Sequence, residues 1–353
     1  MQGMCEIRKG TTVHKVEGKA IYASRGYEII CSRDGGKNWE VDGFVHAPWW
    51  RRNLDSISLF RRISRGGVAN VLLQKEGTRL CVLAGMIARA EAGSSEYRCV
   101  FRFSKGSRPL NLCQDENGNI YWGEYFLNLR RAEPVRIFGS QDGGKSWGVV
   151  WTFPRGTICH IHQVVHDPHD HSILVCTGDR DHEVAILKTT DGFHTLRPLV
   201  EGNQRYRTAS LIPLPDYILY GTDNPGGKNY IMALDRQTGL AKELQEVPGP
   251  VLYGSRVGDH TVFATMVEKQ YHEASLWCGN GSGFSMVGHF KAEKWNRPVR
   301  ELMGYPTLIL PDGRSQWPYL YFTPVGTGLY DGNLMRMDLN QALNKNASIL
   351  RPV

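Results

Sequence analysis

The sequence predicts an all-β fold, a single-domain β-propeller of four-stranded antiparallel blades. Three observations predict it: two near-identical turn octets, short apolar runs that recur along the chain, and a composition rich in turn-forming and aromatic residues. The 353 residues include 39 Gly, 15 Tyr and 9 Trp, as expected of many short strands and tight turns. No break in composition divides the chain, so we expect one domain over residues 1–353.

Two octets carry the turn signal. Ser32–Trp39 reads SRDGGKNW, and Ser140–Trp147 reads SQDGGKSW. Ser and Asp oxygens can accept hydrogen bonds from backbone N–H groups, paired glycines permit positive φ, and the Trp anchors the next strand. A degraded third copy, Thr189–Leu196, has Phe193 in place of a glycine. Because the octets follow β-rich runs, we expect them to form repeated hairpin turns.

These octets resemble the Asp-box, or BNR, repeat of the sialidase superfamily and of other carbohydrate-active β-propellers. The resemblance implies that each box lies where the third strand of a blade turns into the fourth. It specifies architecture far better than chemistry. Sialidases use an arginine triad, a Tyr–Glu nucleophile pair and an Asp acid, and their N-terminal Arg-Ile-Pro motif has only a loose counterpart in Arg61–Ser64, which lacks the proline. This departure argues against sialidase activity itself.

The apolar runs define the repeat. Seven of them begin at residues 21, 80, 120, 173, 218, 262 and 320, so successive runs start 40 to 59 residues apart. A four-stranded blade occupies roughly 40–50 residues, so the spacing predicts seven blades, with the six blades of sialidases as the alternative. We interpret each run as the second strand of its blade. The second unit lacks a recognisable fourth strand, and residues 48–65 are expected to form an irregular loop over one face.

Loops at one rim of such a propeller bring together polar residues that are distant in sequence. The loops that lead into the inner strands supply His160-Ile-His162 and Arg205-Tyr-Arg207, and strand alternation pairs the outer two residues of each triplet. The loops that leave the second strands supply the other candidates: Glu124, Tyr125, Asn128, Asp179, Arg180, Asp181, Glu183, Asp223 and Glu268. We therefore expect the functional site on this rim of the middle blades.

The first hypothesis for the site is β-elimination on an acidic polysaccharide or oligosaccharide. Elimination needs a base, a cation that stabilises the enolate-like state and an acid for the leaving oxygen. Propeller polysaccharide lyases, which the chain resembles in its inferred architecture, use His, Tyr and Arg in these roles. The candidates are His160 or His162 as base, Arg205 or Arg207 as carboxylate clamp, and Tyr206 or Tyr125 as acid. The other exit-loop residues, with Glu268, would contact the substrate.

Two other hypotheses stay open. In glycoside hydrolysis, one carboxyl acts as acid and another as nucleophile or base, and the candidates are Glu124, Asp179, Asp181 and Glu183. In the third hypothesis, the rim is a non-catalytic module that grips a glycan or a protein, as Asp-box propellers do in photosystem assembly factors. Elimination is slightly favoured, because His, Tyr and Arg occupy neighbouring loops.

A divalent metal is compatible with the site but is not required by it, and no other cofactor is expected. His160 and His162, at i and i+2, could hold Zn²⁺ or Mn²⁺. His166, His169 and His171 flank a turn signal at Pro168 and are expected to form a solvated hairpin at the opposite rim. Most of the Trp side chains are expected to be buried between blades, with Trp49 and Trp50 the most exposed pair. Near that pair, a basic cluster would attract an anionic ligand: Arg51, Arg52, Arg61, Arg62 and Arg65.

Charge and hydropathy limit the classes of partner. The formal net charge of +7 suits an acidic glycan, and nucleic acid is not expected because no nucleic-acid-binding signature is present. No apolar run of about 18 residues predicts a membrane span. The N-terminus lacks the apolar core of a signal peptide, so we expect a cytoplasmic protein, or an extracellular or periplasmic one if the N-terminus was trimmed. The eight scattered cysteines are predicted to be mostly buried free thiols, and no oligomeric state is specified.

Overall fold

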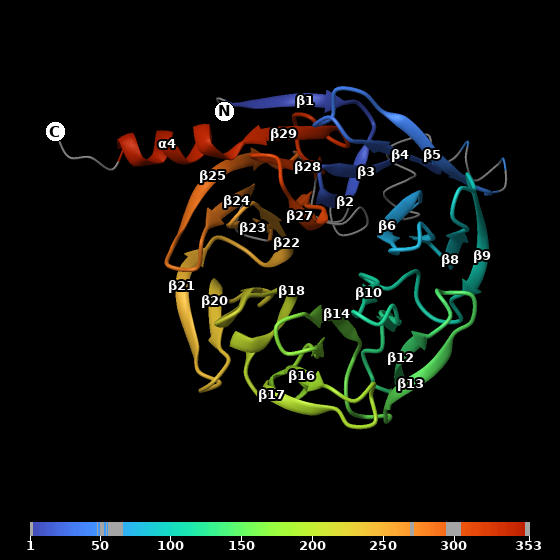
Figure 1. Ribbon diagram of the computed structural model, residues 1–353. Coiled ribbons are helices and arrows are strands. Elements are labelled where there is room, and N and C mark those ends of the chain that lie inside the picture. The colour runs from blue at the N-terminus through green and yellow to red at the C-terminus, as the bar shows by residue number, and fades with distance from the viewer. Residues whose placement is uncertain are drawn as a thin grey trace.

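A computed structural model of the chain shows strands arranged as a ring around a central axis (Figure 1). The structure describes residues 3–47, 49, 53, 55, 66–268, 272–293 and 305–349. The predicted all-β propeller of four-stranded antiparallel blades is confirmed. Most of the predicted 48–65 loop, including its basic cluster and Trp50, lies outside the described residues, as does Trp295.

Three blades are separate sheets whose strands follow one another in sequence, from the inside of the ring outwards. The first contains β10 (Cys113–Gln114), β11 (Ile120–Gly123), β12 (Val135–Ser140) and β13 (Gly148–Phe153). The next contains β14 (Ile161–Asp167), β15 (Ser172–Thr177), β16 (Ala185–Thr189) and β17 (Arg197–Glu201). The third contains β18 (Thr208–Pro213), β19 (Tyr217–Thr222), β20 (Asn229–Asp235) and β21 (Ala241–Val247).

A 13-stranded sheet joins three further four-stranded units. These contain β2 (Thr12–Gly18), β3 (Ala20–Arg25), β4 (Glu28–Ser32) and β5 (Glu40–Val45); β6 (Val68–Leu73), β7 (Arg79–Leu83), β8 (Met86–Ala90) and β9 (Glu96–Arg102); and β22 (Val251–Val257), β23 (His260–Thr265), β24 (Glu273–Gly279) and β25 (Phe284–Lys291). The expectation that the second unit lacks a fourth strand is wrong, because β9 pairs with β8. That strand is largely exposed, and its sequence has only a three-residue apolar stretch, Cys99–Phe101, flanked by charged residues.

The strand β27 (Asp312–Ser315) joins the first and third of these units, and the second is joined through the parallel pairing of β5 with β9. The strand β27 pairs in parallel with both β2 and β22. Gly313 on this strand has φ +95°, and a Cβ atom there would lie 2.2 Å from the carbonyl oxygen of Val16. Only glycine permits this close approach of two backbones.

The two ends of the chain meet in the closing blade. Its strands are β26 (Thr307–Ile309), β28 (Tyr319–Val325) and β29 (Leu334–Asp338), and the N-terminal β1 (Met4–Arg8) pairs antiparallel with β29 as the outermost strand. Helix α4 (Leu339–Ile349) follows β29 and extends away from the ring (Figure 1). The ring is thus closed by hydrogen bonds between segments that are more than 300 residues apart in sequence.

The octets form the expected turns between the third and fourth strands of their blades. The Asp34 carboxylate accepts backbone N–H bonds from Lys37 and Asn38 at 3.0 and 2.9 Å. Ser32 Oγ accepts from Gly36 N at 3.0 Å, and the second octet repeats these bonds. In the degraded copy, Phe193 occupies the glycine position at φ +72°, and Thr195 N still donates to Asp191 at 2.9 Å.

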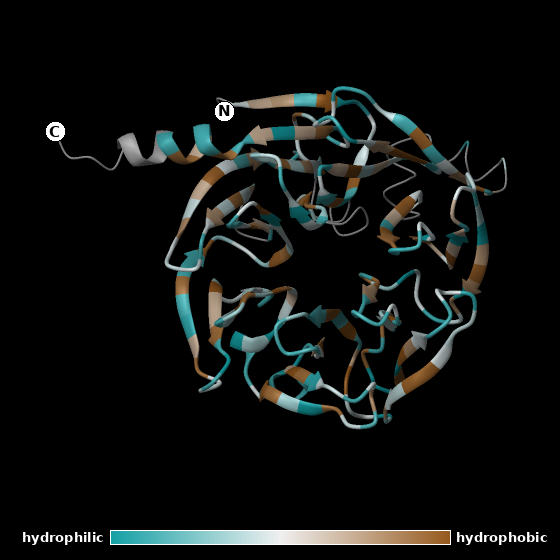
Figure 2. Ribbon diagram, viewed as in Figure 1, coloured by the Kyte–Doolittle hydropathy of each residue, from teal (hydrophilic) through white to brown (hydrophobic). Residues whose placement is uncertain are grey.

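Hydrophobic residues are concentrated in the strands, and many of the connecting loops are hydrophilic (Figure 2). The buried core consists of clusters that each combine residues from two neighbouring four-stranded units. One cluster contains Tyr121 and Val164, and another contains Cys176 and Leu211. All eight cysteines are free, six of them buried, which confirms the predicted thiols. Trp122 is buried, whereas Trp49 is 71% exposed. The core therefore lies between blades, and the axis is left open for a cavity.

Candidate functional site

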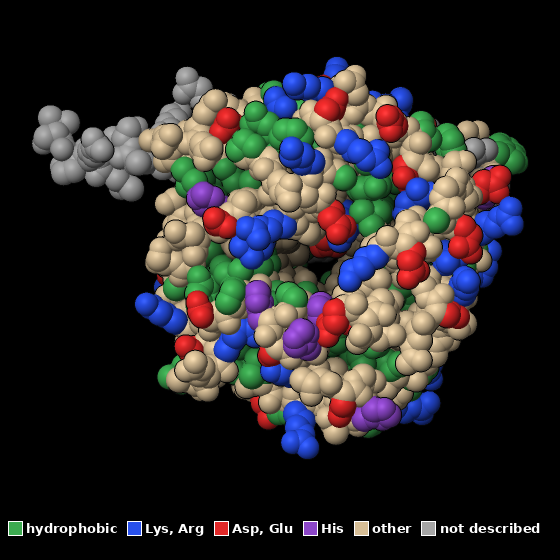
Figure 3. Space-filling view, viewed as in Figure 1, with side chains coloured by type: hydrophobic (Ala, Val, Ile, Leu, Met, Phe, Trp, Pro, Cys, Tyr) green, Lys and Arg blue, Asp and Glu red, His purple; other side chains and the backbone are tan. Residues whose placement is uncertain are grey.

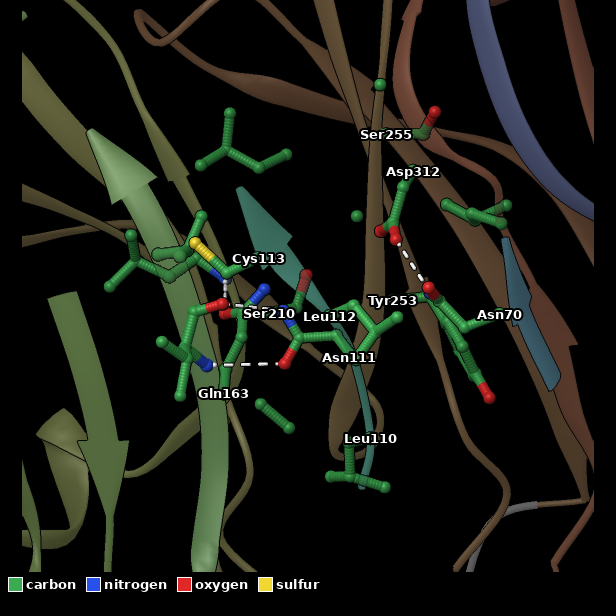
Figure 4. A pocket seen from close by; sticks show the side chains of 18 of the residues that line it. Asn70, Leu110, Asn111, Leu112, Cys113, Gln163, Ser210, Tyr253, Ser255 and Asp312 are labelled. Carbon is green, nitrogen blue, oxygen red and sulfur yellow. Dashed lines mark hydrogen bonds between the residues drawn. The ribbon is translucent and has the colours of Figure 1, made fainter. Parts of the chain in front are cut away.

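A cavity of about 1050 Å³ lies on the axis of the ring. Charged and histidine side chains surround its opening (Figure 3). Side-chain amides on the inner strands project into it (Figure 4) and tie neighbouring blades together: Asn111 bonds both backbone groups of Val164, and Gln163 accepts from Leu211 N. These amides satisfy strand edges that would otherwise be unpaired. The cavity is therefore bounded by inner strands that these hydrogen bonds link to one another.

Two histidines and an aspartate meet at the wall of this cavity. His160 directly precedes β14 and His162 is its second residue, so both rings lie on the same side of the backbone. Their Nε2 atoms are 3.0 Å apart. Asp179 Oδ1, from the loop after β15, lies 3.5 Å from His160 Nε2 and 3.4 Å from His162 Nε2. Both imidazoles therefore direct Nε2 towards one another and towards one carboxylate oxygen.

Arg207 connects this group to the next blade. Its Nη2 lies 3.1 Å from Asp179 Oδ1 and 3.4 Å from Asp223 Oδ2. Its Nη1 donates to the carbonyl oxygen of Asp179 at 3.3 Å. We refer to His160, His162, Asp179, Arg207 and Asp223 as the charge cluster; all five line the cavity.

Tyr125 brings an aromatic ring to the charge cluster. It lies in the loop after β11 and lines the cavity, and its ring centroid is 4.3 Å from that of His160. The next residue, Phe126, offers its carbonyl oxygen to His160 Nδ1 at 3.3 Å. The loop of one blade thus fixes the orientation of a histidine on the next.

The protonation states of the charge cluster follow from burial and charge. Burial, reinforced by the neighbouring His162, lowers the pKa of His160 to about 4. Burial alone would raise the pKa of Asp179, but its bond to His162 and the charges of His160 and Arg207 outweigh it, so its pKa lies well below the usual range. At neutral pH, His160 is therefore uncharged and Asp179 is ionised.

A buried ion pair next to the charge cluster was not found by sequence reasoning. Arg131 Nε and Nη2 donate to the two carboxylate oxygens of Glu183 at 2.6 and 2.8 Å. Glu183 also accepts from Asp179 N at 3.4 Å. Glu183 was expected to contact substrate, but its carboxylate is occupied by this pair. No local pattern identifies Arg131, because its partner is 52 residues away and its backbone takes an unusual φ of +52°.

Two other exit-loop candidates form hydrogen bonds with the backbone of nearby residues in their own blade. Glu124 is buried, and its Oε2 accepts from Arg136 N at 2.8 Å. The Asn128 amide is also buried and exchanges hydrogen bonds with the backbone of Glu133. Neither side chain lines the cavity. Burial raises the pKa of Glu124, but the group lies behind the cavity wall.

The predicted pairing of Arg205 with Arg207 is wrong. Residues Gln204–Tyr206 form a short 3-10 helix, so period-two alternation does not apply to this triplet. Arg205 Nη2 donates to the carbonyl oxygen of Ala241 at 2.8 Å, and Tyr206 packs against a blade core. Neither residue lines the cavity.

The remaining candidates lie at the edge of the rim or on the far side. Arg180 and Asp181 are exposed, and Glu268 Oε2 accepts from Gly226 N at 2.9 Å. The expected hairpin after β14 is present. Its first histidine, His166, is partly buried beside Glu116 and lines the cavity, so it is less solvated than expected.

Two ligand sets for a metal ion can be formed within the described residues. The ligand atoms of Cys159, His160 and Asp179 lie within 4.8 Å of one another. Replacing Cys159 with His162 gives a tighter set, with separations of 3.0 to 3.5 Å. Burial raises the pKa of the Cys159 thiol, which favours the form that does not bind metal.

Comparison with known proteins identifies the fold but no family. No protein-family model and no curated protein match the chain. An ancestral GH74 enzyme superposes with a TM-score of 0.56 at 13% identity, over 93% of this chain and 44% of that one. The GH74 enzyme of Niastella koreensis gives a TM-score of 0.55 at 14% identity, over 81% and 47%. This chain therefore spans less than half the length of both.

A further structure, described as YCF48 bound to D1 peptide, gives a TM-score of 0.53 at 14% identity over 95% of this chain and 94% of that one. All of these identities are low, so the likeness shows a shared propeller fold and no more. Within the described residues, no helix is both long and apolar enough to cross a membrane.

Proposed function

We propose that the chain is a carbohydrate-active protein that binds an acidic glycan at the charge cluster and cleaves it by β-elimination. The observation that carries the proposal is the convergence of two imidazoles, a guanidinium, two carboxylates and Tyr125 at the wall of one large cavity. Clusters of buried, interacting titratable groups in a cavity are typical of catalytic sites.

The charge cluster favours elimination over hydrolysis. A hydrolase needs one carboxyl group that stays protonated to act as general acid. Asp179 and Asp223 are the two cavity-lining carboxylates of the cluster, and Arg207 lies between them at 3.1 and 3.4 Å. Burial alone would raise the pKa of Asp179, but its bond to His162 and the charges of His160 and Arg207 outweigh burial, so this carboxyl does not stay protonated. Glu124 and Glu183 are held elsewhere, so the predicted acid–base pair of a hydrolase is not assembled.

The geometry supports a change in the predicted roles. The Nε2 atoms of His160 and His162 face each other, and His160 Nδ1 faces a backbone carbonyl, so neither ring directs Nε2 at a substrate. We assign proton transfer to Tyr125 and keep the predicted role of carboxylate clamp for the guanidinium of Arg207. The phenolate of Tyr125 would take the proton from C5 of a uronate, the C4–O bond would break as a C4=C5 double bond forms, and the phenol would return the proton to the leaving oxygen.

The experiment is a panel of uronate- and sialate-containing polysaccharides, assayed in parallel for ultraviolet absorbance and for new reducing ends. Elimination produces both signals, and hydrolysis produces ends alone. Tyr125→Phe should lower the rate about 10²- to 10⁴-fold, whereas Tyr330→Phe, away from the cavity, should not. Reducing ends without absorbance would replace elimination with hydrolysis.

The second candidate function is non-catalytic binding of a protein or glycan. It is favoured by the likeness to the YCF48 structure, which covers nearly the whole of both chains, whereas the GH74 enzymes are covered by less than half. No absorbance and no reducing ends, together with retained binding of a glycan or peptide, would support this candidate instead.

A further inference from the structure

We propose that His160, His162 and Asp179 form a binding site for one divalent transition-metal cation, of the class of Zn²⁺ or Mn²⁺. The inference deepens the proposed function, because the cation would neutralise the carboxylate of the acidic sugar. The site itself stands on geometry that does not depend on that function.

The three ligand atoms have the spacing that a single cation requires. His160 Nε2, His162 Nε2 and Asp179 Oδ1 form a triangle with sides of 3.0, 3.4 and 3.5 Å. The point equidistant from the corners of this triangle lies about 1.9 Å from each, slightly less than the 2.0–2.2 Å of Zn–N and Zn–O bonds. A cation displaced by less than about 1 Å from the plane would therefore reach all three atoms without moving them, and its open side would remain available.

The hydrogen bonds around the triangle orient the ligands. His160 Nδ1 lies 3.3 Å from the carbonyl oxygen of Phe126, which can only accept, so Nδ1 carries the proton and Nε2 presents a lone pair. Metal-binding histidines are commonly fixed in this way by a backbone carbonyl. Asp179 is fixed by Arg207 at one side and, through its backbone N–H, by Glu183 at the other. His160 and Asp179 are thus held in place by residues of three loops, whereas Nδ1 of His162 has no hydrogen-bond partner among the described residues and its ring is positioned by β14 alone.

The formal charges of the cluster are compatible with a bound cation. With both imidazoles in the neutral form that binds metal, Asp179 and Asp223 contribute two negative charges and Arg207 one positive charge. The charge cluster then carries a net charge of −1 and would repel a sugar carboxylate. A divalent cation changes the balance to +1, and the two carboxylates offset its repulsion from the guanidinium.

The test is metal binding by the full chain after treatment with a chelator and dialysis. Zn²⁺ and Mn²⁺ are titrated separately by calorimetry, and bound metal is counted by elemental analysis. We expect one ion per chain for at least one of the two cations. His162→Ala and Asp179→Asn should each weaken binding by more than about 100-fold, since even changes to outer-shell residues weaken metal binding 10- to 100-fold.

Two control variants distinguish this site from its competitors. Cys159→Ser tests the alternative set and should leave binding unchanged, and His171→Ala tests the exposed hairpin histidines and should also leave it unchanged. Circular dichroism verifies that each variant is folded. Absence of binding, loss of binding in Cys159→Ser, or wild-type binding in folded His162→Ala would overturn the proposal.

The glycan assay separates this inference from the proposed function. Metal binding without cleavage of any polysaccharide would support the metal site and refute the proposed β-elimination. Cleavage at the full rate by chelator-treated protein that binds neither cation would support the elimination and overturn the metal site.

Discussion

Replacement of Arg131 by alanine is expected to destabilise the protein strongly, although the residue touches no predicted ligand. The side chains of Arg131 and Glu183 are only 7% and 1% exposed, and they share two hydrogen bonds of 2.6 and 2.8 Å. Truncation of Arg131 leaves a buried carboxylate without its counter-charge, which costs about 3–5 kcal/mol. We therefore expect Arg131→Ala to lower the free energy of unfolding by this amount.

The assay is urea unfolding followed by tryptophan fluorescence, with a double-mutant cycle. Arg131→Met combined with Glu183→Leu removes both charges, and such replacements are often neutral or stabilising. The double variant should therefore be more stable than Arg131→Met alone or Glu183→Leu alone. A loss below about 1 kcal/mol in Arg131→Ala, or simple additivity in the cycle, would refute the assignment of a buried, coupled pair.

The pH dependence supplies a second readout of the same pair. Burial alone would raise the pKa of Glu183, but the bond from Arg131 outweighs it and lowers the pKa below that of the unfolded chain. Its contribution in the wild type is therefore present above about pH 4.3 and is lost as the pH falls further. Without Arg131, burial should raise the pKa instead, so the variant should recover stability on acidification and the gap to the wild type should narrow.

Three further predictions concern other parts of the ring. Asp142→Ala removes the carboxylate that accepts two backbone bonds in its Asp-box turn, and should cost roughly 1–3 kcal/mol in chemical unfolding. Gly313→Ala should lower the melting temperature much more than Gly10→Ala, because both have positive φ but only Gly313 would place a Cβ against the backbone, 2.2 Å from Val16 O. Burial lowers the pKa of His14 to about 3, so wild-type stability should fall below about pH 6.5, and His14→Gln should flatten this slope by about 1.4 kcal/mol per pH unit.

The fold could be predicted largely because its signals are local. An Asp-box turn is specified within eight residues, since the Asp34 carboxylate bonds to N–H groups three and four positions later. The degraded copy shows how much such a turn tolerates: Phe193 N still donates to Thr189 and Thr195 N to the Asp191 carboxylate, although Phe193 takes a glycine conformation. The strand β9 was missed because this largely exposed strand has only a short apolar stretch to mark it.

The charge cluster could be predicted only in part, because it depends on contacts between blades. The positions of His160 and His162 followed from strand alternation, and Asp179 and Asp223 from the rim on which their loops lie. Arg205 was placed incorrectly, since it lies in a single 3-10 turn in which strand alternation does not apply. The occupation of Glu183 by Arg131 could not be foreseen, because that ion pair joins loops of two different blades.

The pairing of β1 with β29 also constrains the order of events during synthesis. Met4 pairs with Met337, so β1 has no partner during synthesis until the more than 300 residues that separate it from β29 have been made. At about 5–20 residues per second, that interval is of the order of tens of seconds. Blades formed from consecutive strands can assemble during this time, because their contacts are local, whereas closure must await the last segment and is expected to be the slow, non-local step. An unpaired β1 is also a strand edge on which two nascent chains could exchange partners, so premature contact between ribosome-bound copies is the misfolding route that this topology invites.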